Sequence, residues 1–167
     1  DAAAEKFGMP MGPIELADQV GLDICLAVGD MLRSKFGEAA LPPAPDWLRD
    51  KVKNGELGRK TGKGFYEWKD GKAVKMPSPM QPTDEMIDRL ILPMSNVCVA
   101  CLREGIVDNA DVVDGAMIFG TGYAPFRGGP LNYARTRGVE NVVATLRELA
   151  ARFGDRFTPD TGWETFK

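Results

Sequence analysis

Apolar side chains recur at helical spacing in two long stretches of this chain. Between Asp23 and Gly37 they fall on one face of a helix, at Ile24, Ala27, Val28, Met31, Leu32 and Phe36. Asp23 is the predicted N-cap of this helix and Gly37 its predicted end. A second stripe begins near Glu140 and comprises Val143, Leu146, Leu149, Ala150 and Phe153. Both stretches therefore predict amphipathic helices.

Two more helical patterns lie between them. Thr83 is predicted to cap a long helix that ends at Gly105 and contains Pro93. Its apolar side comprises Ile87, Leu90, Ile91, Met94, Val97, Cys98, Cys101 and Leu102. Asn109 is the predicted cap of the next helix. We expect its inward-facing side chains to be Val112, Val113, Ala116 and Phe119. The fold class is therefore predicted to be mainly α.

Shorter elements are expected in the first half of the chain. Ala2–Phe7 has the pattern of the last turns of a helix ended by Gly8, so we expect an element upstream of Asp1. A short helix is expected from about Asp46. Apolar and polar residues alternate on both sides of Asp70-Gly71, which predicts a small β-hairpin formed by Phe65–Trp68 and Ala73–Val74.

The chain also contains an internal repeat. Gly12–Glu38 matches Gly129–Asp155 without a gap, at an offset of 117 positions. The identical pairs are Gly12/Gly129, Pro13/Pro130, Ala17/Ala134, Gly21/Gly138, Ala27/Ala144, Leu32/Leu149, Phe36/Phe153 and Gly37/Gly154. Such a repeat predicts two copies of one packing unit that share a helical fold. Function is therefore sought where the copies differ.

Three prolines in Met76–Pro82 exclude a helix there and mark a linker. We therefore expect a first domain at residues 1–75, a linker at 76–82 and a second copy at 83–167. The predicted hairpin belongs to the first domain.

Composition excludes several kinds of chemistry. With 167 residues, 44% of them hydrophobic, the chain has enough apolar material for one medium domain or two small helical ones. Its net charge of -3, without a long basic run, gives no support for a nucleic-acid partner. It has no histidine, so Ser-His-Asp hydrolysis, His-based acid/base catalysis and most catalytic zinc sites are disfavoured.

The N-terminal sequence Asp-Ala-Ala-Ala-Glu-Lys is not a cleavable apolar signal. No stretch of 18 apolar residues is long enough to span a bilayer. We therefore expect a cytoplasmic protein without a membrane span.

Cys98-x-x-Cys101 allows two interpretations. The pair has the spacing of a redox motif or half a metal site, but it also continues the apolar stripe of a predicted helix. Because the chain has neither a second such pair nor a histidine, we favour a buried core position and expect no bound metal.

Gly58–Gly64, with the sequence GRKTGKG, resembles a phosphate-binding loop at first sight. A P-loop needs four residues between its glycines, Ser or Thr after the lysine, and a following helix, whereas here Phe65 follows directly. One interpretation is an anion or phosphate contact through backbone amides and the cations Arg59, Lys60 and Lys63. The other is a structural turn whose cations face a neighbouring domain.

Glycine- and proline-rich turns precede both matched segments, at Phe7–Pro13 and Phe119–Pro130. Each turn is either a repeated corner between helices or, in the first copy, a lining for a flexible acyl chain. The candidate lining residues are Met9, Pro10, Met11, Gly12 and Pro13. The second copy has Thr121–Ala124 in this region, and we expect it to bind no acyl chain.

The two segments Phe7–Asp23 and Gly58–Tyr66 together closely resemble the C-terminal domain of 3-hydroxyacyl-CoA dehydrogenases. Two such domains in tandem are similar to the C-terminal part of the multifunctional fatty-acid oxidation protein, which joins an enoyl-CoA hydratase/isomerase to the dehydrogenase. The resemblance covers nearly all of the chain. It implies two tandem helical domains, with the family's first C-terminal-domain helix preceding Asp1.

The resemblance also implies what this chain lacks. In the family, hydride transfer relies on a Rossmann domain for NAD, a His-Glu pair, and an Asn in an Asn-Arg-Leu-Leu type motif. The matching segment of the second copy, Asp88–Pro93, begins with Asp88. We therefore expect no catalytic residue and no bound cofactor in this chain, with NAD bound by the parent enzyme and the second copy serving as a degenerate packing partner.

Two functional hypotheses follow. The first is the substrate-side and packing part of an NAD-dependent 3-hydroxyacyl-CoA dehydrogenase in fatty-acid β-oxidation, inactive in isolation. Its implied partners are acyl-CoA, the upstream NAD-binding and enoyl-CoA hydratase domains, and a homo-oligomer or a thiolase subunit. The second hypothesis is a non-catalytic helical module for association or acyl-CoA binding.

Overall fold

The computed structural model describes residues 1–37, 41–76 and 81–166. The chain divides into two compact units: Asp1 with Met11–Met80, and Ala2–Pro10 with Gln81–Lys167. Most of the predicted linker, residues 77–80, lies outside the described residues. Ala2–Pro10, which we assigned to the first domain from the sequence, groups with the second unit instead.

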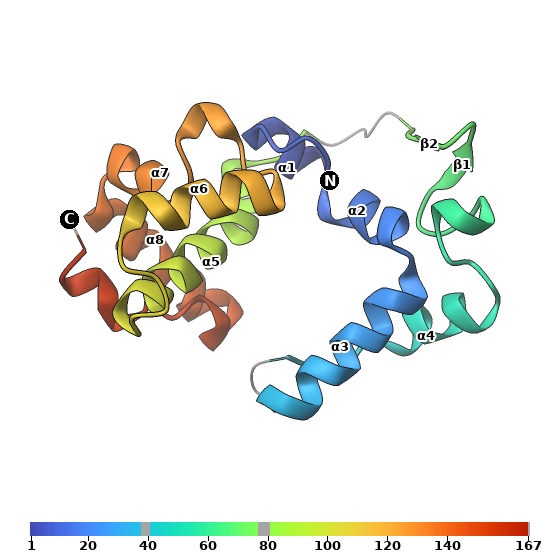
Figure 1. Cartoon of the computed structure of the whole chain (residues 1–167), viewed down its shortest axis with the longest axis horizontal. Helices are drawn as coiled ribbons and strands as arrows, with labels where there is room; N and C mark the ends of the chain where they lie inside the picture. Colours follow the sequence, from blue (N-terminus) through green and yellow to red (C-terminus); the bar gives the residue numbers. More distant parts are fainter. Residues whose placement is uncertain (38–40, 77–80, 167) are drawn as a thin grey trace. The chain divides into compact units, whose positions relative to one another are not determined.

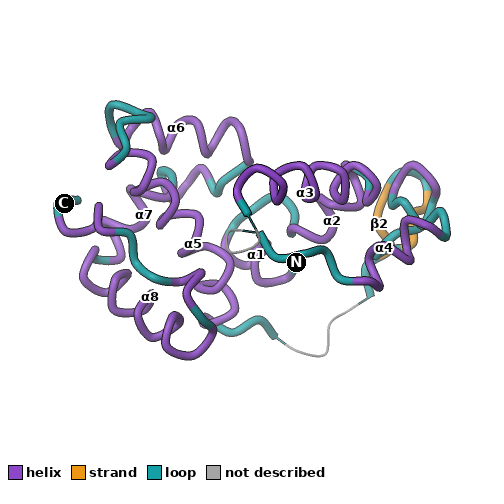
Figure 2. Tube along the Cα trace, turned by 90° about the horizontal axis from the view of Figure 1, so that it is seen from below, coloured by secondary structure: helices purple, strands orange, loops and turns teal. Residues whose placement is uncertain are grey.

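The first unit contains three helices, α2 (Pro13–Val20), α3 (Leu22–Phe36) and α4 (Asp46–Lys53), and a 3-10 turn at Arg59–Thr61, among its described residues. Two short antiparallel strands follow, with Trp68 opposite Ala73, as predicted around the Asp-Gly turn. These are β1 (Glu67–Lys69) and β2 (Lys72–Val74), at one end of this unit in Figure 2. Helix α3 packs against α2 and α4.

The second unit is helical throughout its described part. It contains α1 (Ala2–Phe7), α5 (Asp84–Arg103), α6 (Ala110–Thr121), α7 (Pro130–Arg137) and α8 (Val139–Phe153). Short 3-10 segments lie at Pro125–Arg127, Asp155–Phe157 and Thr161–Glu164. Helix α5 packs against α1, α7 and α8, and α6 packs against α7 (Figure 1). The chain is therefore mainly helical, as predicted.

Apolar burial is concentrated in the second unit. Its main cluster joins α5, α7 and α8, and its fully buried members are Leu92, Leu131, Ala134, Val142 and Leu146. A smaller cluster surrounds Phe7 and Tyr123. In the first unit the buried side chains of the described part are Leu22, Trp68 and the carboxylate of Asp18.

The repeat is visible in the helix boundaries. Helices α2 and α7 begin and end at positions 117 residues apart, and so do α3 and α8. Glycines stand at the matched ends: Gly21 and Gly138 precede the longer helices, and Gly37 and Gly154 follow them. The matched local structure agrees with a duplicated unit.

The capping predictions have mixed outcomes. Thr83 accepts a hydrogen bond from the Met86 amide, and Asn109 accepts one from the Val112 amide, so both predicted caps are confirmed. The predicted Asp23 cap is wrong, because α3 begins one residue earlier, at Leu22, and its N-cap is Gly21.

The predicted inward face of α6 is wrong in part. Val113 is buried, but Val112 and Ala116 are exposed and Phe119 is 91% exposed. Met117 shares the inward side with Val113 and Asp114 because it follows them by four and three residues. Phe119, two residues after Met117, therefore lies on the opposite side. No described helix is both long and apolar enough to cross a membrane.

Candidate functional site

The turn Phe7–Pro13 joins the two units. Phe7, Met9 and Pro10 belong to the second unit, whereas Met11 and the residues after it belong to the first. Met9 is half-buried against the cluster around Phe7 and Tyr123. Pro10 is exposed, although it lies close to Gly122: a Cβ added at Gly122 would stand 3.1 Å from the Pro10 Cγ. The five predicted lining residues are therefore consecutive but lie in two different local environments.

The other three lining residues begin α2. Met11 is half-buried, and its Sδ accepts a hydrogen bond from the Gln19 amide at 3.5 Å. Gly12 is the N-cap residue, and Pro13 is the first residue of the helix, where its fixed φ is favourable. Asp1 lies so close to Gly12 that an added Cβ would stand 2.2 Å from its atoms. Glycine at this position is therefore a packing requirement.

Aspartates cap the matched helices α2 and α7 from a distance. Asp1 accepts hydrogen bonds from the amides of Ile14 and Glu15, at 2.8 and 2.9 Å. In the second copy Asp114 accepts from the amides of Leu131 and Asn132, at 2.7 and 2.9 Å. A carboxylate at a helix N-terminus satisfies its free N–H groups and interacts favourably with the helix dipole. This pair of caps was not predicted from the sequence.

The glycine-rich loop of the first unit encloses the carboxylate of Asp18. That side chain is fully buried and accepts hydrogen bonds from the amides of Phe65 and Tyr66, both at 2.9 Å, and from the Trp68 indole at 3.0 Å. A Cβ at either Gly58 or Gly64 would stand 2.2 Å from an oxygen of Asp18. The glycines thus allow the loop to close around this carboxylate, which favours the structural interpretation.

The three predicted cations of this loop do not converge. Lys60 forms an ion pair with Asp23, and Lys63 forms one with Glu56, which also pairs with Lys51. The guanidinium of Arg59 lies beside the hairpin turn at Gly71. The hydrogen bond from Lys60 lowers the pKa of Asp23, and those from Lys51 and Lys63 lower the pKa of Glu56 to about 2. These pairings favour a structural turn over an anion site.

Cys98 lies in the main apolar cluster of the second unit. Burial raises the pKa of its thiol to about 12, so this group is protonated at neutral pH. The placement of Cys98 agrees with the preferred interpretation as core, whereas Cys101 is only half-buried. Among residues 1–37, 41–76 and 81–166, no cluster of three potential metal ligands occurs.

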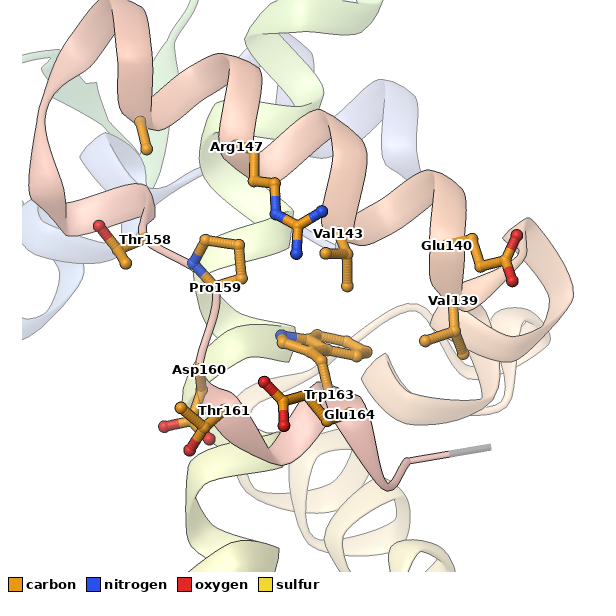
Figure 3. Close-up of a pocket in the computed structure, with 11 residues that line it drawn as sticks. Val139, Glu140, Val143, Arg147, Thr158, Pro159, Asp160, Thr161, Trp163 and Glu164 are labelled. Atoms are coloured by element: carbon orange, nitrogen blue, oxygen red, sulfur yellow. The ribbon is translucent and has the colours of Figure 1, made fainter.

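A cavity of about 590 Å³ lies in the second unit between α8 and the Thr158–Glu164 segment. Figure 3 shows the Trp163 ring in its centre, with Val143 and Arg147 of α8 across from it. Asn96 fixes the Thr158–Glu164 side of the cavity, because its side-chain oxygen accepts hydrogen bonds from the Asp160 amide and the Trp163 indole, both at 2.8 Å. This cavity was not predicted from the sequence.

A smaller cavity, of about 280 Å³, contains Asp88, the residue that stands where the family motif has Asn. Its carboxylate forms a two-point ion pair with Arg137, whose Nη2 donates to Oδ2 at 2.8 Å. Arg137 also donates a hydrogen bond to the Tyr133 hydroxyl. Both oxygens of Asp88 are therefore engaged within the protein, as expected of a packing role for the second copy.

The described residues do not fit a dinucleotide. The sheet found among them is the two-stranded hairpin, and no glycine-rich turn leads from a parallel strand into a helix. Any NAD-dependent chemistry therefore requires a site outside this part of the structure.

Comparisons with known proteins agree with the resemblance seen in the motifs. Residues 1–68 match the family model described as "3-hydroxyacyl-CoA dehydrogenase, C-terminal domain". The chain is 34% identical, over its whole length, to a fatty acid oxidation complex subunit alpha from Idiomarina loihiensis. It is 37% identical, over 97% of its length, to the subunit of the same name from Vibrio campbellii. The chain spans about a quarter of these relatives, 26% and 24% of their lengths.

A solved structure shares the fold. The match to a crystal structure of 3-hydroxybutyryl-CoA dehydrogenase from Escherichia coli K12 covers 99% of this chain and 53% of the dehydrogenase chain, with a TM-score of 0.79. Its sequence identity is 20%, so this match concerns the fold alone.

Proposed function

Because residues 1–68 match the family model of the 3-hydroxyacyl-CoA dehydrogenase C-terminal domain, we propose that this chain is the substrate-side and packing part of such an enzyme. The parent enzyme would be NAD-dependent, act in fatty-acid β-oxidation and carry an enoyl-CoA hydratase elsewhere on the same polypeptide. The observation that carries this proposal is that both sequence motifs, the Phe7–Pro13 turn and the Gly58–Tyr66 loop, lie within the matched residues.

The proposed contribution of this chain is an apolar lining for the acyl group. Met9, Pro10, Met11, Gly12 and Pro13 offer a surface with two flexible, polarizable side chains, which tolerate acyl chains of different lengths. The half-buried state of both methionines supports this role, since each keeps part of its side chain accessible while its position is fixed by neighbours.

The first copy is proposed to be completed by a helix supplied by the parent enzyme. In the second copy α5 covers α7 and α8, and Leu131 of α7 is fully buried. Its repeat partner in α2, Ile14, is 39% exposed. A helix equivalent to α5, packed on α2 and α3, would account for this difference. The domain boundaries at 75 and 83 stay a prediction.

The remaining partners are proposals of the same kind. NAD would bind an upstream domain, and acyl-CoA would be bound between that domain and this chain. A second copy of the enzyme or a thiolase subunit is the proposed assembly partner, and the cytoplasm the proposed compartment. Contact of Arg59, Lys60 and Lys63 with an acidic neighbouring domain or with CoA phosphates also stays a prediction.

The proposal is tested by comparing chain lengths in the parent enzyme. Met9→Ala and Met11→Ala should lower turnover of long-chain 3-hydroxyacyl-CoA more than that of four-carbon substrate, because each buried CH₂ contributes about 0.8 kcal/mol. The purified 167-residue chain, mixed with NAD and substrate, should form no NADH. Equal losses for short and long substrates would refute the lining role, and NADH formed by the isolated chain would refute the assignment as a non-catalytic part.

A non-catalytic association or acyl-CoA-binding module is the alternative. The observation that favours it is the set of exposed apolar side chains on α3, including Ile24, Val28 and Met31. Calorimetric titration of the isolated chain with acyl-CoA distinguishes the two functions. Tight binding that does not require the upstream domains supports the module, whereas binding only in the parent enzyme supports the dehydrogenase part.

A further inference from the structure

The second copy contacts the acyl-lining turn through one side chain in particular. Arg127 Nε donates a hydrogen bond to the main-chain carbonyl oxygen of Phe7 at 2.8 Å. Phe7 is the last residue of α1, and carbonyls at a helix C-terminus have no partner within the helix. Met9, the first proposed lining residue, follows two positions later.

Aromatic rings hold the guanidinium of Arg127 in this position. Its Cζ lies 4.0 Å from the ring centroid of Phe7, 5.0 Å from that of Phe126 and 5.3 Å from that of Tyr133. Across residues 1–37, 41–76 and 81–166, Arg127 forms no ion pair with a carboxylate. Its interactions are therefore directed to the end of α1 and the rings around it.

The backbone around Arg127 is itself fixed. The Arg127 amide donates to the Ala124 carbonyl at 3.1 Å, and the Asn132 side chain donates to the Arg127 carbonyl at 2.8 Å. Gly128 follows with a φ of 73°, which ends the 3-10 segment. The arginine therefore projects from a rigid support.

The lining turn is also fitted closely against this support. A Cβ at Gly8 would stand 2.4 Å from the Phe126 ring, and one at Gly122 would stand 3.1 Å from Pro10. The Phe7 ring packs edge-on against Tyr123 and Tyr133, with centroids 5.5 and 5.0 Å away. A side chain at Gly8 would require the Phe126 ring to move, and the Phe7 ring is contacted by two tyrosines of the second copy.

We propose that Arg127 is a positioning residue for substrate, which holds the Phe7–Pro10 segment in the conformation that lines the acyl chain. This rests on the proposed function of the turn. It assigns an active role to the second copy, which has the longer of the two turns. In the second copy the capping Asp114 lies 17 residues before its amide partner Leu131, whereas in the first copy Asp1 lies 13 residues before Ile14. The longer turn supplies the arginine.

The test uses the parent enzyme with four-carbon and sixteen-carbon 3-hydroxyacyl-CoA. Arg127→Lys keeps the charge but loses the planar donor, and should lower kcat/KM for the long substrate by about tenfold, or about 1.4 kcal/mol. The loss with the short substrate should be less than about twofold. Guanidinium ions should restore part of the long-chain activity of Arg127→Ala, and the amide of Met9 should exchange faster in both variants.

Arg152→Ala is the matched control. Arg152 also stacks on a phenylalanine, Phe153, at 4.8 Å and pairs with Glu85. Within the described part of the chain, no hydrogen bond or ring contact joins it to the turn. It should leave chain-length preference unchanged even if it lowers stability. Equal losses for both substrates in the Arg127 variants, or no loss, would overturn the positioning role.

Met9→Ala in the same assay separates the two proposals. A long-chain defect in Met9→Ala together with normal Arg127 variants would overturn the positioning role and leave the lining role intact. Normal chain-length preference in Met9→Ala would overturn both.

Discussion

The first copy is organised around a buried carboxylate, whereas the second is organised around apolar side chains. Asp18 holds the hairpin and glycine-rich loop against α2 with three hydrogen bonds, and ion pairs such as Lys60–Asp23 surround it. At the position of Asp18 in the repeat, the second copy has the exposed residue Arg135, and its described residues, 83–166, contain no hairpin. The matched helix pairs, α2–α3 and α7–α8, are therefore stabilised differently, by polar contacts in the first copy and by apolar packing in the second.

The matched helices α3 and α8 extend this contrast. Three exposed apolar residues of α3, Ile24, Val28 and Met31, correspond at the 117-residue offset to polar residues of α8, namely Asn141, Thr145 and Glu148. A face that is apolar only in the first copy is typical of a surface that another element covers. The difference supports the proposal that another element of a parent enzyme covers the first copy, whereas the second copy has an apolar core of its own.

Truncating one matched leucine pair should show the largest difference. Leu149 of α8 is buried in the main cluster, whereas its partner Leu32 of α3 is half-buried. Leu149→Ala should lower the free energy of unfolding by about 3 kcal/mol because it leaves a cavity, and Leu32→Ala by about 1 kcal/mol. Urea unfolding followed by circular dichroism measures both, and equal losses would contradict the contrast between the helices.

The next largest effect should come from the buried carboxylate. Asp18→Asn replaces one of its acceptor oxygens by a donor, facing backbone amides and an indole that also donate. We expect a loss of about 2 kcal/mol and a change in Trp68 fluorescence as the hairpin loosens. Arg135→Ala, at the matched position, should cost less than about 1 kcal/mol. A stable Asp18→Asn variant with unchanged fluorescence would show that other contacts hold the loop.

Removing two tyrosine hydroxyls should have different effects on stability. The Tyr66 hydroxyl donates to Asp1 at 2.7 Å, whereas the buried Tyr123 hydroxyl has no partner among the described residues. Tyr66→Phe should therefore lower stability by about 1 kcal/mol, while Tyr123→Phe should be neutral or stabilising. Thermal unfolding of both variants checks this, and a clear loss in Tyr123→Phe would reveal a partner for that hydroxyl.

The smallest expected effect is a loss of stability of the first copy at acidic pH, through protonation of Glu56. The pKa of Glu56 falls from 4.5 to about 2 through hydrogen bonds from Lys51 and Lys63. Since its folded-state pKa is lowered, this carboxylate stabilises the first copy above about pH 4.5 and loses that contribution as the pH falls toward 2. An NMR titration of the Glu56 side chain should give a midpoint near 2, whereas a midpoint near 4.5 would mean that the pairs are not formed in solution.

The sequence predicted regular elements well where the signal was local. Repeated glycines and apolar spacing identified α3 and α8, and the Asp70-Gly71 pair identified the hairpin. The prediction for Phe119 failed because neighbouring valines in α6 fit more than one face of a helix, and only packing against α7 selects one of them.

The contacts around the candidate site could not be predicted from local patterns, because they join residues far apart in the sequence. The caps from Asp1 and Asp114 cross 13 and 17 residues, so a gapless repeat does not reveal them. Arg127 reaches Phe7 across 120 residues, and no local spacing encodes that contact. An aspartate 11 to 15 positions before a Gly-Pro pair, present in both copies, is the signal that would have found the caps.

Amide hydrogen exchange of α3 and α8 tests the central claim most directly, namely that the first copy needs the parent enzyme and the second does not. In the 167-residue chain, amides of Leu26–Leu32 in α3 should exchange at least about tenfold faster than the matched amides of Val143–Leu149 in α8, because fewer buried contacts protect them. In the parent enzyme this gap should close. Equal protection of the two helices in the isolated chain would contradict the account.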